Sequence, residues 1–313
     1  MVKEKVLVTG GSGYLGARLC LHLADQGYAV TPLCHSKVPE NIDWVSKMEE
    51  VIVGDVRDEK LLGELALNKY DIMIHLVSLD HHQSNGLPSY VSSVNIAPVW
   101  SLLEIFSSRG LKKFVYFSTA QVYGVLKNEQ VTEIQNLNTH NAYALTHQIG
   151  EAICDHFNRN TLVECCVIRL SNSYGPPIFE ENNCWWLAIN NLCKSAYTQK
   201  EIVLQSDGTP LRDFIHSSDV CCGVQLAIET REKHGIYNLS SGTTLSIMEI
   251  AENIRKVFAL RYGLDIPIKT KEPKKPAQAE RYELDNRRLR SIGFEPKKTI
   301  EEGINDLFDY FEK

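Results

Sequence analysis

The sequence predicts an α/β fold in which a doubly wound parallel sheet is joined to a smaller C-terminal α+β lobe. Two observations carry this prediction. Short apolar runs of strand length alternate with helical patterns through the first half of the chain, and a glycine-rich turn separates the first run from the first helix. Strands that alternate with helices form parallel sheets with right-handed crossovers. The 313 residues suffice for about two domains.

The first half of the chain supplies the elements of the sheet. The first strand is 6–8, and Leu15, Leu19 and Leu23 share one face of a helix over 14–26. The further strands are expected at 29–33, 51–53, 72–77, 114–118 and 163–170. The helical patterns between them cover 58–67, 89–108 and 142–158.

The pattern loosens after Pro176 and Pro177, which mark a break in regular structure. The elements expected beyond it are helices over 185–196, 218–229 and 246–258 and strands over 202–204 and 237–239. We therefore expect one domain over residues 1–175 and a second lobe over 176–313, with some later elements returning to the first domain.

Composition excludes several classes of protein. The net charge of −6 argues against a nucleic-acid partner, which requires a basic surface. No run of about 18 apolar residues exists and the first residues lack an apolar signal core, so we expect a cytoplasmic protein without a membrane partner. None of the nine cysteines forms a C-x-x-C pair, and His81 and His82 are adjacent rather than spaced as helical metal ligands. We expect no metal site.

The sequence TGGSGYLG at residues 9–16 lies between the first strand and the first helix. In this context a glycine-rich turn brings backbone N–H groups and a helix N-terminus against a pyrophosphate, as in the Rossmann fold. A side chain at the glycines would block the phosphate. The turn therefore predicts a dinucleotide site formed by Gly10, Gly13, Tyr14 and Leu15.

The residues after the second and third strands are candidates for the adenosine end of the dinucleotide. An acidic residue about 20 positions past the glycines selects NAD, whereas a cation or small donors accept the 2′-phosphate of NADP. This chain has His35, Ser36 and Lys37 there, which slightly favours NADP. Asp55 and Val56 follow the third strand and can lie near the adenine, the alternative being an ordinary loop.

Several further motifs resemble those of the extended short-chain dehydrogenases that act on nucleotide sugars, the NAD(P)-dependent epimerase/dehydratase family. They are FVYFSTAQVYG at 114–124, Tyr143, RLSNSYGP at 169–176, HLVS at 75–78, VN at 94–95, RDFIH at 212–216, YNLSSG at 237–242, Arg281 with Asp285, and GFEP at 293–296. The resemblance covers essentially the whole chain. It implies a bound NAD(P), contacted also by Leu76, Val77 and Ser78, and a nucleoside-diphosphate sugar in the C-terminal lobe.

The resemblance also implies the catalytic residues. Thr119 corresponds to the hydroxyl that binds the reacting sugar oxygen, and Tyr143 to the acid/base that exchanges its proton. A phenol has a pKa near 10, so it acts as a base at neutral pH only beside a cation. The family supplies that cation, which also binds the cofactor, as a lysine four residues on; here the position is His147. With an ordinary pKa near 6.5, a histidine is a weaker and pH-dependent substitute.

The substrate contacts implied by the resemblance lie mostly in the second lobe. Asn172 corresponds to a substrate-binding residue, and Arg212 and Arg281 to the pair that holds the pyrophosphate, for which guanidinium groups offer paired hydrogen bonds. The family also implies a homodimer formed through two long helices, here 89–108 and 142–158.

The reaction type stays open between two alternatives. Dehydratases of the family follow the threonine with Asp-Glu, whereas this chain has Ala120 and Gln121, so a sugar 4,6-dehydratase is disfavoured. C4 epimerisation and reversible reduction of a 4-keto sugar remain, with a small preference for the reductase because both usual ribose anchors are missing. A non-catalytic dinucleotide sensor or scaffold is the alternative from another class, and His147 is its best support.

Overall fold

The computed structural model describes residues 3–127, 129–232, 235–270 and 281–313. The chain folds as two compact units that are discontinuous in sequence. The first contains Met1–Val125, Glu133–Leu170 and Gly223–Tyr237, and the second contains Leu126–Thr132, Ser171–Cys222 and Asn238–Lys313. The opening stretch of the first unit ends at Val125, its second segment ends at Leu170 rather than at the predicted residue 175, and Gly223–Tyr237 returns to it.

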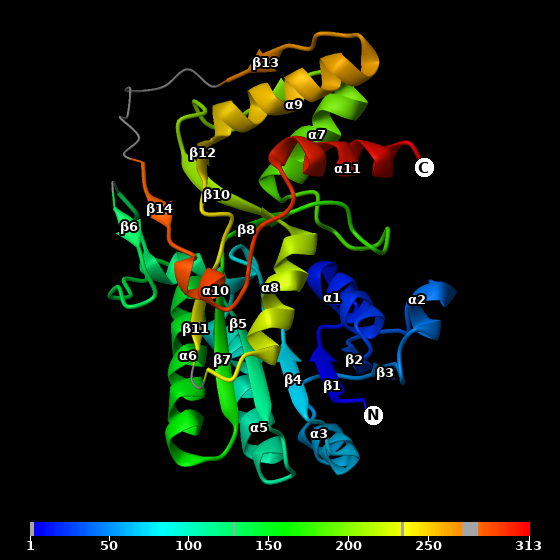
Figure 1. The fold of residues 1–313 in the computed structure, drawn as a ribbon, viewed down its shortest axis with the longest axis vertical. Coiled ribbons are helices and arrows are strands. Elements are labelled where there is room, and N and C mark those ends of the chain that lie inside the picture. The colour runs from blue at the N-terminus through cyan, green and yellow to red at the C-terminus, as the bar shows by residue number, and fades with distance from the viewer. Residues whose placement is uncertain (1–2, 128, 233–234, 271–280) are drawn as a thin grey trace. The chain divides into compact units, whose positions relative to one another are not determined.

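A seven-stranded sheet forms the centre of the first unit. Its strands are β1 (Lys5–Thr9), β2 (Ala29–Cys34), β3 (Ile52–Val53), β4 (Ile72–His75), β5 (Lys113–Thr119), β7 (Glu164–Leu170) and β11 (Ile236–Leu239). They lie in the order β11-β7-β5-β4-β1-β2-β3, and each pair from β7 to β3 is parallel (Figure 1). This order is that of a doubly wound Rossmann sheet, and the predicted fold class is confirmed.

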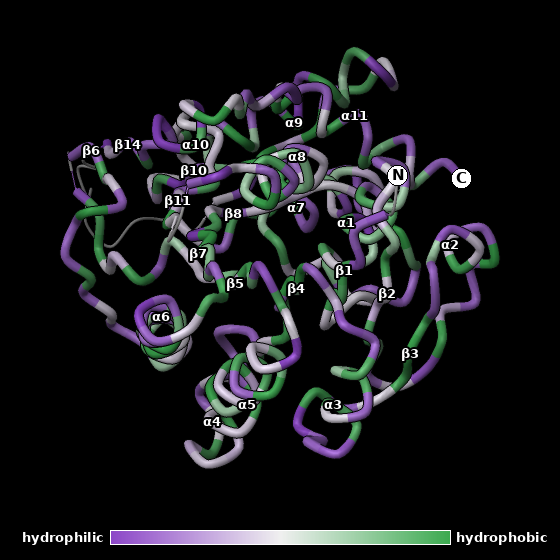
Figure 2. The backbone as a smooth tube through the Cα atoms, turned by 60° about the horizontal axis from the view of Figure 1, so that its bottom comes forward, coloured by the Kyte–Doolittle hydropathy of each residue, from purple (hydrophilic) through white to green (hydrophobic). Residues whose placement is uncertain are grey.

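Helices cover both faces of this sheet. They are α1 (Tyr14–Asp25), α2 (Ile42–Ser46), α3 (Glu59–Leu65), α4 (Pro88–Asn95), α5 (Ala97–Ser107) and α6 (Ala142–Asn160), with short 3-10 turns η1 (Ala66–Asn68), η2 (Gln83–Asn85) and η3 (Ala120–Tyr123). In Figure 2, α3 and α5 alternate between hydrophobic and hydrophilic residues, as expected for helices with one face on a sheet. Their apolar faces meet the strands in a core that includes Leu7, Met73, Leu102, Phe106 and Phe114.

Two predicted elements of the first unit need correction. The single helix expected over 89–108 is two helices, α4 and α5, which meet at Ile96. Pro98 explains the break, because proline has no N–H to continue the hydrogen-bond ladder and its ring crowds the preceding turn. The strand expected over 72–77 ends at His75, so that Leu76, Val77 and Ser78 form an irregular segment after it.

In its described residues, the second unit combines short strands with four helices. Its strands are β6 (Gln130–Val131), β8 (Asn172–Tyr174), β9 (Ile202–Val203), β10 (Leu211–His216), β12 (Thr244–Ser246), β13 (Ile268–Lys269) and β14 (Glu283–Leu284). Its helices are α7 (Ala188–Gln199), α9 (Ile247–Tyr262), α10 (Arg287–Ser291) and α11 (Ile300–Phe311), while α8 (Ser217–Glu229) runs from the second unit into the first. The predicted helix over 185–196 therefore begins three residues late, at Ala188.

A second hydrophobic core holds α7, α9 and α11 together. Ile189, Ile254, Phe258, Leu307 and Phe308 are buried in it. Capping boxes begin α9 at Ser246 with Glu249 and α11 at Thr299 with Glu302. This core supports the three-stranded sheet β12-β10-β8, which carries two of the predicted substrate residues.

A buried lysine of the first unit caps the end of α8. The Lys113 ammonium donates to the carbonyl oxygens of Ile228 and Thr230, each at 2.7 Å, and of Ala227 at 3.4 Å. A cation at a helix C-terminus is favoured by the helix dipole. We expect Lys113→Met to lower the free energy of unfolding by about 2–4 kcal/mol, because buried carbonyls lose a charged donor. Urea denaturation measures this loss.

Lys112 provides the matched control for that substitution. It is the neighbouring residue, and its ammonium lies 2.8 Å from Asp71 on the surface, with 68% of the Lys112 side chain exposed. Exposed ion pairs contribute about 0–1 kcal/mol. Equal losses for Lys112→Met and Lys113→Met would contradict the capping role of Lys113.

Candidate active site

The predicted cofactor residues gather where the strand order of the sheet reverses. The chain winds outward in both directions from the neighbouring strands β1 and β4, and ligands of such sheets bind at the carboxyl ends of the strands at this point. Gly10 follows β1, and a Cβ atom placed on it would lie 3.3 Å from Val77 and 3.6 Å from the carbonyl carbon of Leu76. The structure thus brings the glycine turn against the segment that follows β4.

The glycine turn could not be built from other residues. Gly10 has φ +74°, a left-handed conformation that L side chains rarely adopt. A Cβ on Gly11 would lie 2.4 Å from the Cβ of Pro32, and one on Gly16 would meet the Gly10 carbonyl oxygen at 2.1 Å. Gly13 is the N-cap of α1, so it has no side chain to occupy the first N–H groups of that helix. The local backbone therefore fits a pyrophosphate, with Tyr14 and Leu15 opening the helix.

The residues predicted for the adenosine end follow β2 and β3. His35, Ser36 and Lys37 are exposed, and the His35 Nδ1 atom lies 2.9 Å from the Ser36 hydroxyl. Asp55 lies 3.6 Å from the His35 ring and forms an ion pair with Arg57. The hydrogen bonds from Arg57 hold the pKa of the Asp55 carboxyl well below its usual range. The Val56 side chain is buried in the core.

Arg57 was missed by the sequence reasoning. It donates to both oxygens of Asp55 and lies over the ring of Tyr90 at 5.8 Å. The position of Arg57, two residues after Asp55, was the sequence signal that could have indicated this ion pair. Asp55 is therefore an ion-paired acid rather than a free hydrogen-bond acceptor.

Thr119, Tyr143 and His147 meet at the carboxyl end of β5. Thr119 ends that strand, and its hydroxyl accepts a hydrogen bond from the Gln121 N–H at the start of η3. Tyr143 and His147 come from the first turns of α6, and their rings make an edge-to-face contact with centroids 4.5 Å apart. The Thr119 hydroxyl hydrogen-bonds to the phenol of Tyr143. The structure thus unites the three predicted catalytic residues.

The start of α6 is fixed by hydrogen bonds that involve Gln121, two residues after Thr119. Asn141 caps the helix by accepting from the Ala144 N–H at 2.8 Å, and its own amide donates to Gln121 at 3.2 Å. Gln121 occupies one of the two positions where a dehydratase would carry acids. Here it positions the helix that bears Tyr143 and supplies no titratable group.

A buried ion pair anchors the same helix to the sheet. Arg169 of β7 donates to the carboxylate of Glu151 on α6 at 2.7 and 3.0 Å, and the Ser118 hydroxyl donates to that carboxylate at 2.5 Å. Both side chains of the ion pair are at least nine-tenths buried. Since one unpaired buried charge is costly, this pair fixes α6 against β5 and β7.

Tyr143 is a neutral phenol at physiological pH. Burial raises its pKa to about 12, the hydrogen bond from Thr119 works in the opposite direction, and the charge of Asp80 adds to the increase. A neutral phenol can donate its proton to a developing alkoxide but cannot accept one.

His147 is a neutral imidazole in the folded protein. Its side chain is 4% exposed, and burial lowers its pKa to about 4. Its Nε2 atom lies 3.3 Å from the Ser78 hydroxyl, and its Nδ1 atom lies 3.1 Å from the Tyr116 hydroxyl. His147 therefore offers Tyr143 no positive charge at neutral pH, unlike a lysine at the same position.

His75 is a second buried histidine of this region that the sequence reasoning used only as part of a motif. It ends β4, its Nδ1 atom lies 2.7 Å from the Thr9 hydroxyl, and its ring stacks on Tyr116. Burial, together with the nearby His147, lowers its pKa to about 3. Its Nε2 atom is buried and has no hydrogen-bond partner among the described residues.

Because of these two histidines, we expect the free energy of unfolding to fall in mild acid. Unfolded histidines bind protons near pH 6.5, whereas folded His147 and His75 resist protonation down to about pH 4 and about pH 3. Their contribution is complete above pH 6.5 and falls as the pH drops toward 4, with a slope approaching about 3 kcal/mol per pH unit for two protons. Urea midpoints across this range measure it. His75→Gln and His147→Gln should each remove about half of that slope, and unaltered slopes would contradict the assignment.

The predicted substrate residues of the second unit lie around β10. Asn172 on the adjoining strand β8 is exposed and donates to the Asp213 carbonyl at 3.0 Å. Arg212 is exposed, and Arg281 pairs with Glu249 at 2.9 Å. The Tyr282 hydroxyl reaches the Leu211 carbonyl at 3.5 Å, so the segments that bear the two arginines lie together.

Asp213 shapes the loop next to these residues. Its buried carboxylate accepts hydrogen bonds from the Ser241 hydroxyl at 2.8 Å and from the N–H groups of Ser241, Gly242 and Thr243 at 2.9–3.1 Å. Gly242 has φ +78°, which the tight turn requires. The motifs RDFIH and YNLSSG thus contact each other next to Arg212, the second residue of β10.

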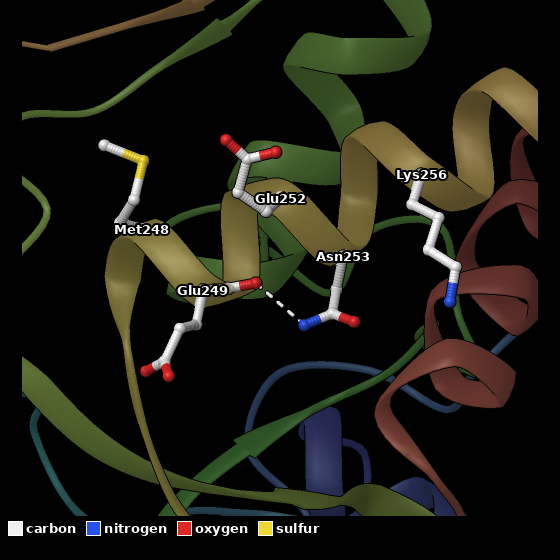
Figure 3. Close-up of a pocket in the computed structure, with 5 residues that line it drawn as sticks. All are labelled: Met248, Glu249, Glu252, Asn253 and Lys256. Atoms are coloured by element: carbon white, nitrogen blue, oxygen red, sulfur yellow. Dashed lines mark hydrogen bonds between the residues drawn. The ribbon is translucent and has the colours of Figure 1, made fainter.

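A shallow hollow lies along one face of α9. Figure 3 shows its five lining side chains, with the Asn253 amide donating to the backbone carbonyl of Glu249 at 2.8 Å; they are Met248, Glu249, Glu252, Asn253 and Lys256. None of the predicted site residues lines it, although Glu249 is the ion-pair partner of Arg281. The hollow is formed by one helix and is not a candidate for the reaction centre.

Two further properties concern the described residues alone. They contain no group of three or more His, Cys, Asp or Glu side chains arranged to hold a metal ion. None of the helices in this part of the chain combines the length and the apolar character that a membrane crossing requires.

Comparisons with known proteins agree with the fold. A putative UDP-glucose 4-epimerase from Methanocaldococcus jannaschii is 26% identical over 97% of both chains. A dTDP-glucose 4,6-dehydratase from Streptomyces niveus is 24% identical over 98% of this chain and 92% of its own length. MoeE5, solved with UDP-glucuronic acid and NAD, has a TM-score of 0.83 at 22% identity and covers 98% of this chain and 99% of its own. The model of the NAD dependent epimerase/dehydratase family matches residues 6–240. This match spans most of the chain, which therefore belongs to the NAD dependent epimerase/dehydratase family.

Proposed function

We propose that this protein uses bound NAD(P) to transfer a hydride at C4 of a nucleoside-diphosphate sugar. The observation that carries the proposal is the contact of Thr119 with Tyr143 at the carboxyl edge of the sheet, with His147 one helical turn beyond. The cofactor supplies and accepts the hydride. Tyr143 exchanges the proton of the sugar oxygen, and Thr119 holds that oxygen by a hydrogen bond.

The surroundings of Tyr143 favour reduction of a 4-keto sugar over the opposite direction. A carbonyl that receives a hydride needs a proton, which the neutral phenol of Tyr143 can donate. Oxidation of an alcohol needs the phenolate, and the neutral His147 does not stabilise that anion. A 4-epimerase requires both directions within one turnover, so the same observation makes a ketoreductase the better proposal.

NADP is the preferred form of the cofactor in this proposal. The adenosine 2′-phosphate would lie at the carboxyl end of β2, where His35, Ser36 and Lys37 are exposed. These residues can donate hydrogen bonds to phosphate oxygens, and no carboxylate among them repels the phosphate or binds a ribose hydroxyl. The MoeE5 structure contains NAD, which makes NAD the alternative.

The substrate proposal rests on Asn172, Arg212 and Arg281. Two guanidinium groups on neighbouring segments can each donate paired hydrogen bonds to a pyrophosphate. Arg281 would exchange its exposed ion pair with Glu249 for that contact, at a small cost because exposed pairs contribute about 0–1 kcal/mol. Three relatives or neighbours named above act on or bind nucleotide sugars by their names, which supports this substrate class.

One experiment separates the proposed reductase from its alternatives. Small molecules released from the denatured protein are identified by mass spectrometry, and the reduced-nicotinamide absorbance is then followed with a panel of nucleotide sugars and their 4-keto derivatives. We expect exchangeable NADP and consumption of its reduced form with a 4-keto sugar. Tightly retained NAD with no net change in absorbance would favour an epimerase, and retained dinucleotide without sugar binding would favour a sensor.

The proposal includes a homodimer formed through the first unit. Helices α4, α5 and α6 pack on one another and bear apolar side chains that are 36–51% exposed, namely Tyr90, Trp100, Leu145 and Ile149. Clustered exposed apolar groups mark protein interfaces. We expect the Leu145→Lys, Ile149→Lys double variant to sediment as a monomer and the wild type as a dimer. Leu162→Lys, at a 98% exposed position outside these helices, is the control and should stay dimeric. A monomeric wild type would refute this part.

A further inference from the structure

The ring of His147 lies between two hydroxyl groups, one near each nitrogen, and it also hydrogen-bonds to the backbone of Phe117. Ser78, in the segment after β4, lies 3.3 Å from Nε2, and Tyr116 of β5 lies 3.1 Å from Nδ1. A neutral imidazole has one nitrogen that donates and one that accepts, so the two hydroxyls must play opposite roles. The chemistry of the neighbours decides which nitrogen carries the hydrogen.

The Ser78 hydroxyl donates its hydrogen to an acceptor other than His147. It donates to the backbone carbonyl of Leu79 at 2.9 Å, and a carbonyl oxygen can only accept. Toward His147, the Ser78 oxygen is therefore an acceptor, and Nε2 must be the nitrogen that carries the hydrogen. The Nδ1 atom then has a lone pair, and the Tyr116 hydroxyl is the donor that it faces.

The Tyr116 side chain is buried and packed beside His147. It is 2% exposed, and burial raises the pKa of its phenol well above the usual value, so that its hydroxyl keeps its hydrogen. A Cβ on Gly150 of α6 would lie 2.2 Å from the Tyr116 oxygen. The ring stacks on His75, with centroids 6.2 Å apart. Gly150 on the helix thus leaves room for the Tyr116 hydroxyl to reach His147.

We propose that Tyr116 is a positioning residue that holds His147 as the Nε2–H tautomer, so that the position usually occupied by a lysine ammonium presents a neutral hydrogen-bond donor toward Ser78. The inference rests on the proposed function for its catalytic consequence, but the tautomer itself is a property of the folded chain. In the other tautomer, Nε2 would present a lone pair to the Ser78 oxygen and no donor on the side assigned to the cofactor.

Nitrogen-15 NMR of protein labelled at histidine tests the tautomer directly. Two-bond couplings between ring nitrogens and carbon-bound hydrogens distinguish Nε2–H from Nδ1–H, and the signal of His147 among the ten histidines is the one missing from a His147→Gln spectrum. At pH 7.5 we expect the Nε2–H pattern in the wild type and a mixture of both tautomers in Tyr116→Phe. An Nδ1–H pattern in the wild type, or an unchanged pattern in Tyr116→Phe, would overturn the proposal.

Tyr70→Phe is the matched control. Tyr70 is also a buried phenol of the first unit, but it precedes β4 at the opposite end of the strand and its hydroxyl contacts Asn68 at 3.4 Å. It should leave the His147 pattern unchanged, and a change there would show that any lost phenol hydroxyl disturbs the ring.

Kinetics separate this inference from the proposed function. With a 4-keto sugar that the wild type reduces, Tyr116→Phe should lower kcat about 3- to 10-fold, which corresponds to one net hydrogen bond. The KM of the sugar should stay unchanged. If Tyr116→Phe altered the tautomer but kept the wild-type kcat, the tautomer would have no effect on catalysis. A wild type that turns over no sugar but shows the expected tautomers would refute the proposed function alone.

Discussion

Replacing Tyr143 by phenylalanine should lower kcat for the reduction of a 4-keto sugar by about 10²- to 10⁴-fold, the usual contribution of a positioned acid or base. The substitution removes one oxygen atom from a partly buried ring and keeps the edge-to-face contact with His147. Single-turnover consumption of the reduced cofactor measures the loss. The affinity for the dinucleotide, measured by titration of its fluorescence, should stay within about threefold because the glycine turn is untouched.

The control for Tyr143→Phe is again Tyr70→Phe, which removes a buried phenol oxygen at the far end of β4. It should retain wild-type kcat. If Tyr143→Phe folded normally and kept more than about a tenth of wild-type kcat, Tyr143 would not be the proton donor.

The raised pKa of Tyr143 gives the same assignment a pH signature. Because the phenol is protonated below about pH 12, the reductive rate should be level across the neutral range. The oxidative rate needs the phenolate, so it should rise about tenfold per pH unit until it approaches that value. Rates measured in both directions at the same pH values test this asymmetry.

Local patterns predicted those parts of the site that the backbone itself forms. The glycine turn, the first helix and the order of strands follow from turn chemistry and from the spacing of apolar residues, which depend on neighbours in sequence. The break between α4 and α5 was equally local, since Pro98 stands in the sequence, but the apolar periodicity on both sides of it favoured one helix.

The electrostatic character of the site could not be predicted in this way. The sequence places His147 four residues after Tyr143, which suggests a pH-dependent cation near neutrality. Its burial against Ser78 and Tyr116, which are 69 and 31 residues away in the chain, makes it a neutral donor instead. The capping of α8 by Lys113, across more than a hundred residues, is likewise a product of tertiary packing.

Replacing His147 by lysine should lower the pH midpoint of the oxidative rate by about 1–3 pH units, the usual effect of an opposite charge within about 4–6 Å of an acid. The sign follows from the charge states. His147 is neutral above about pH 4, whereas an ammonium beside the phenolate stabilises that anion and so lowers the pKa of Tyr143. The midpoint is read from oxidative rates of His147→Lys and the wild type between neutral and strongly alkaline pH.

The surroundings of position 147 can accept an ammonium in place of an imidazole. Its three N–H groups would face oxygen atoms that lie by the histidine ring, namely the Ser78 hydroxyl, the backbone carbonyl of Phe117, and the Tyr116 hydroxyl, which would change from donor to acceptor. His147→Gln is the control, because it supplies donors without charge and should leave the midpoint where it is. A midpoint that His147→Lys does not move, in a protein with wild-type stability, would mean that Tyr143 is not the group that titrates. A midpoint lowered equally by glutamine would mean that the histidine acts through its shape rather than through its missing charge.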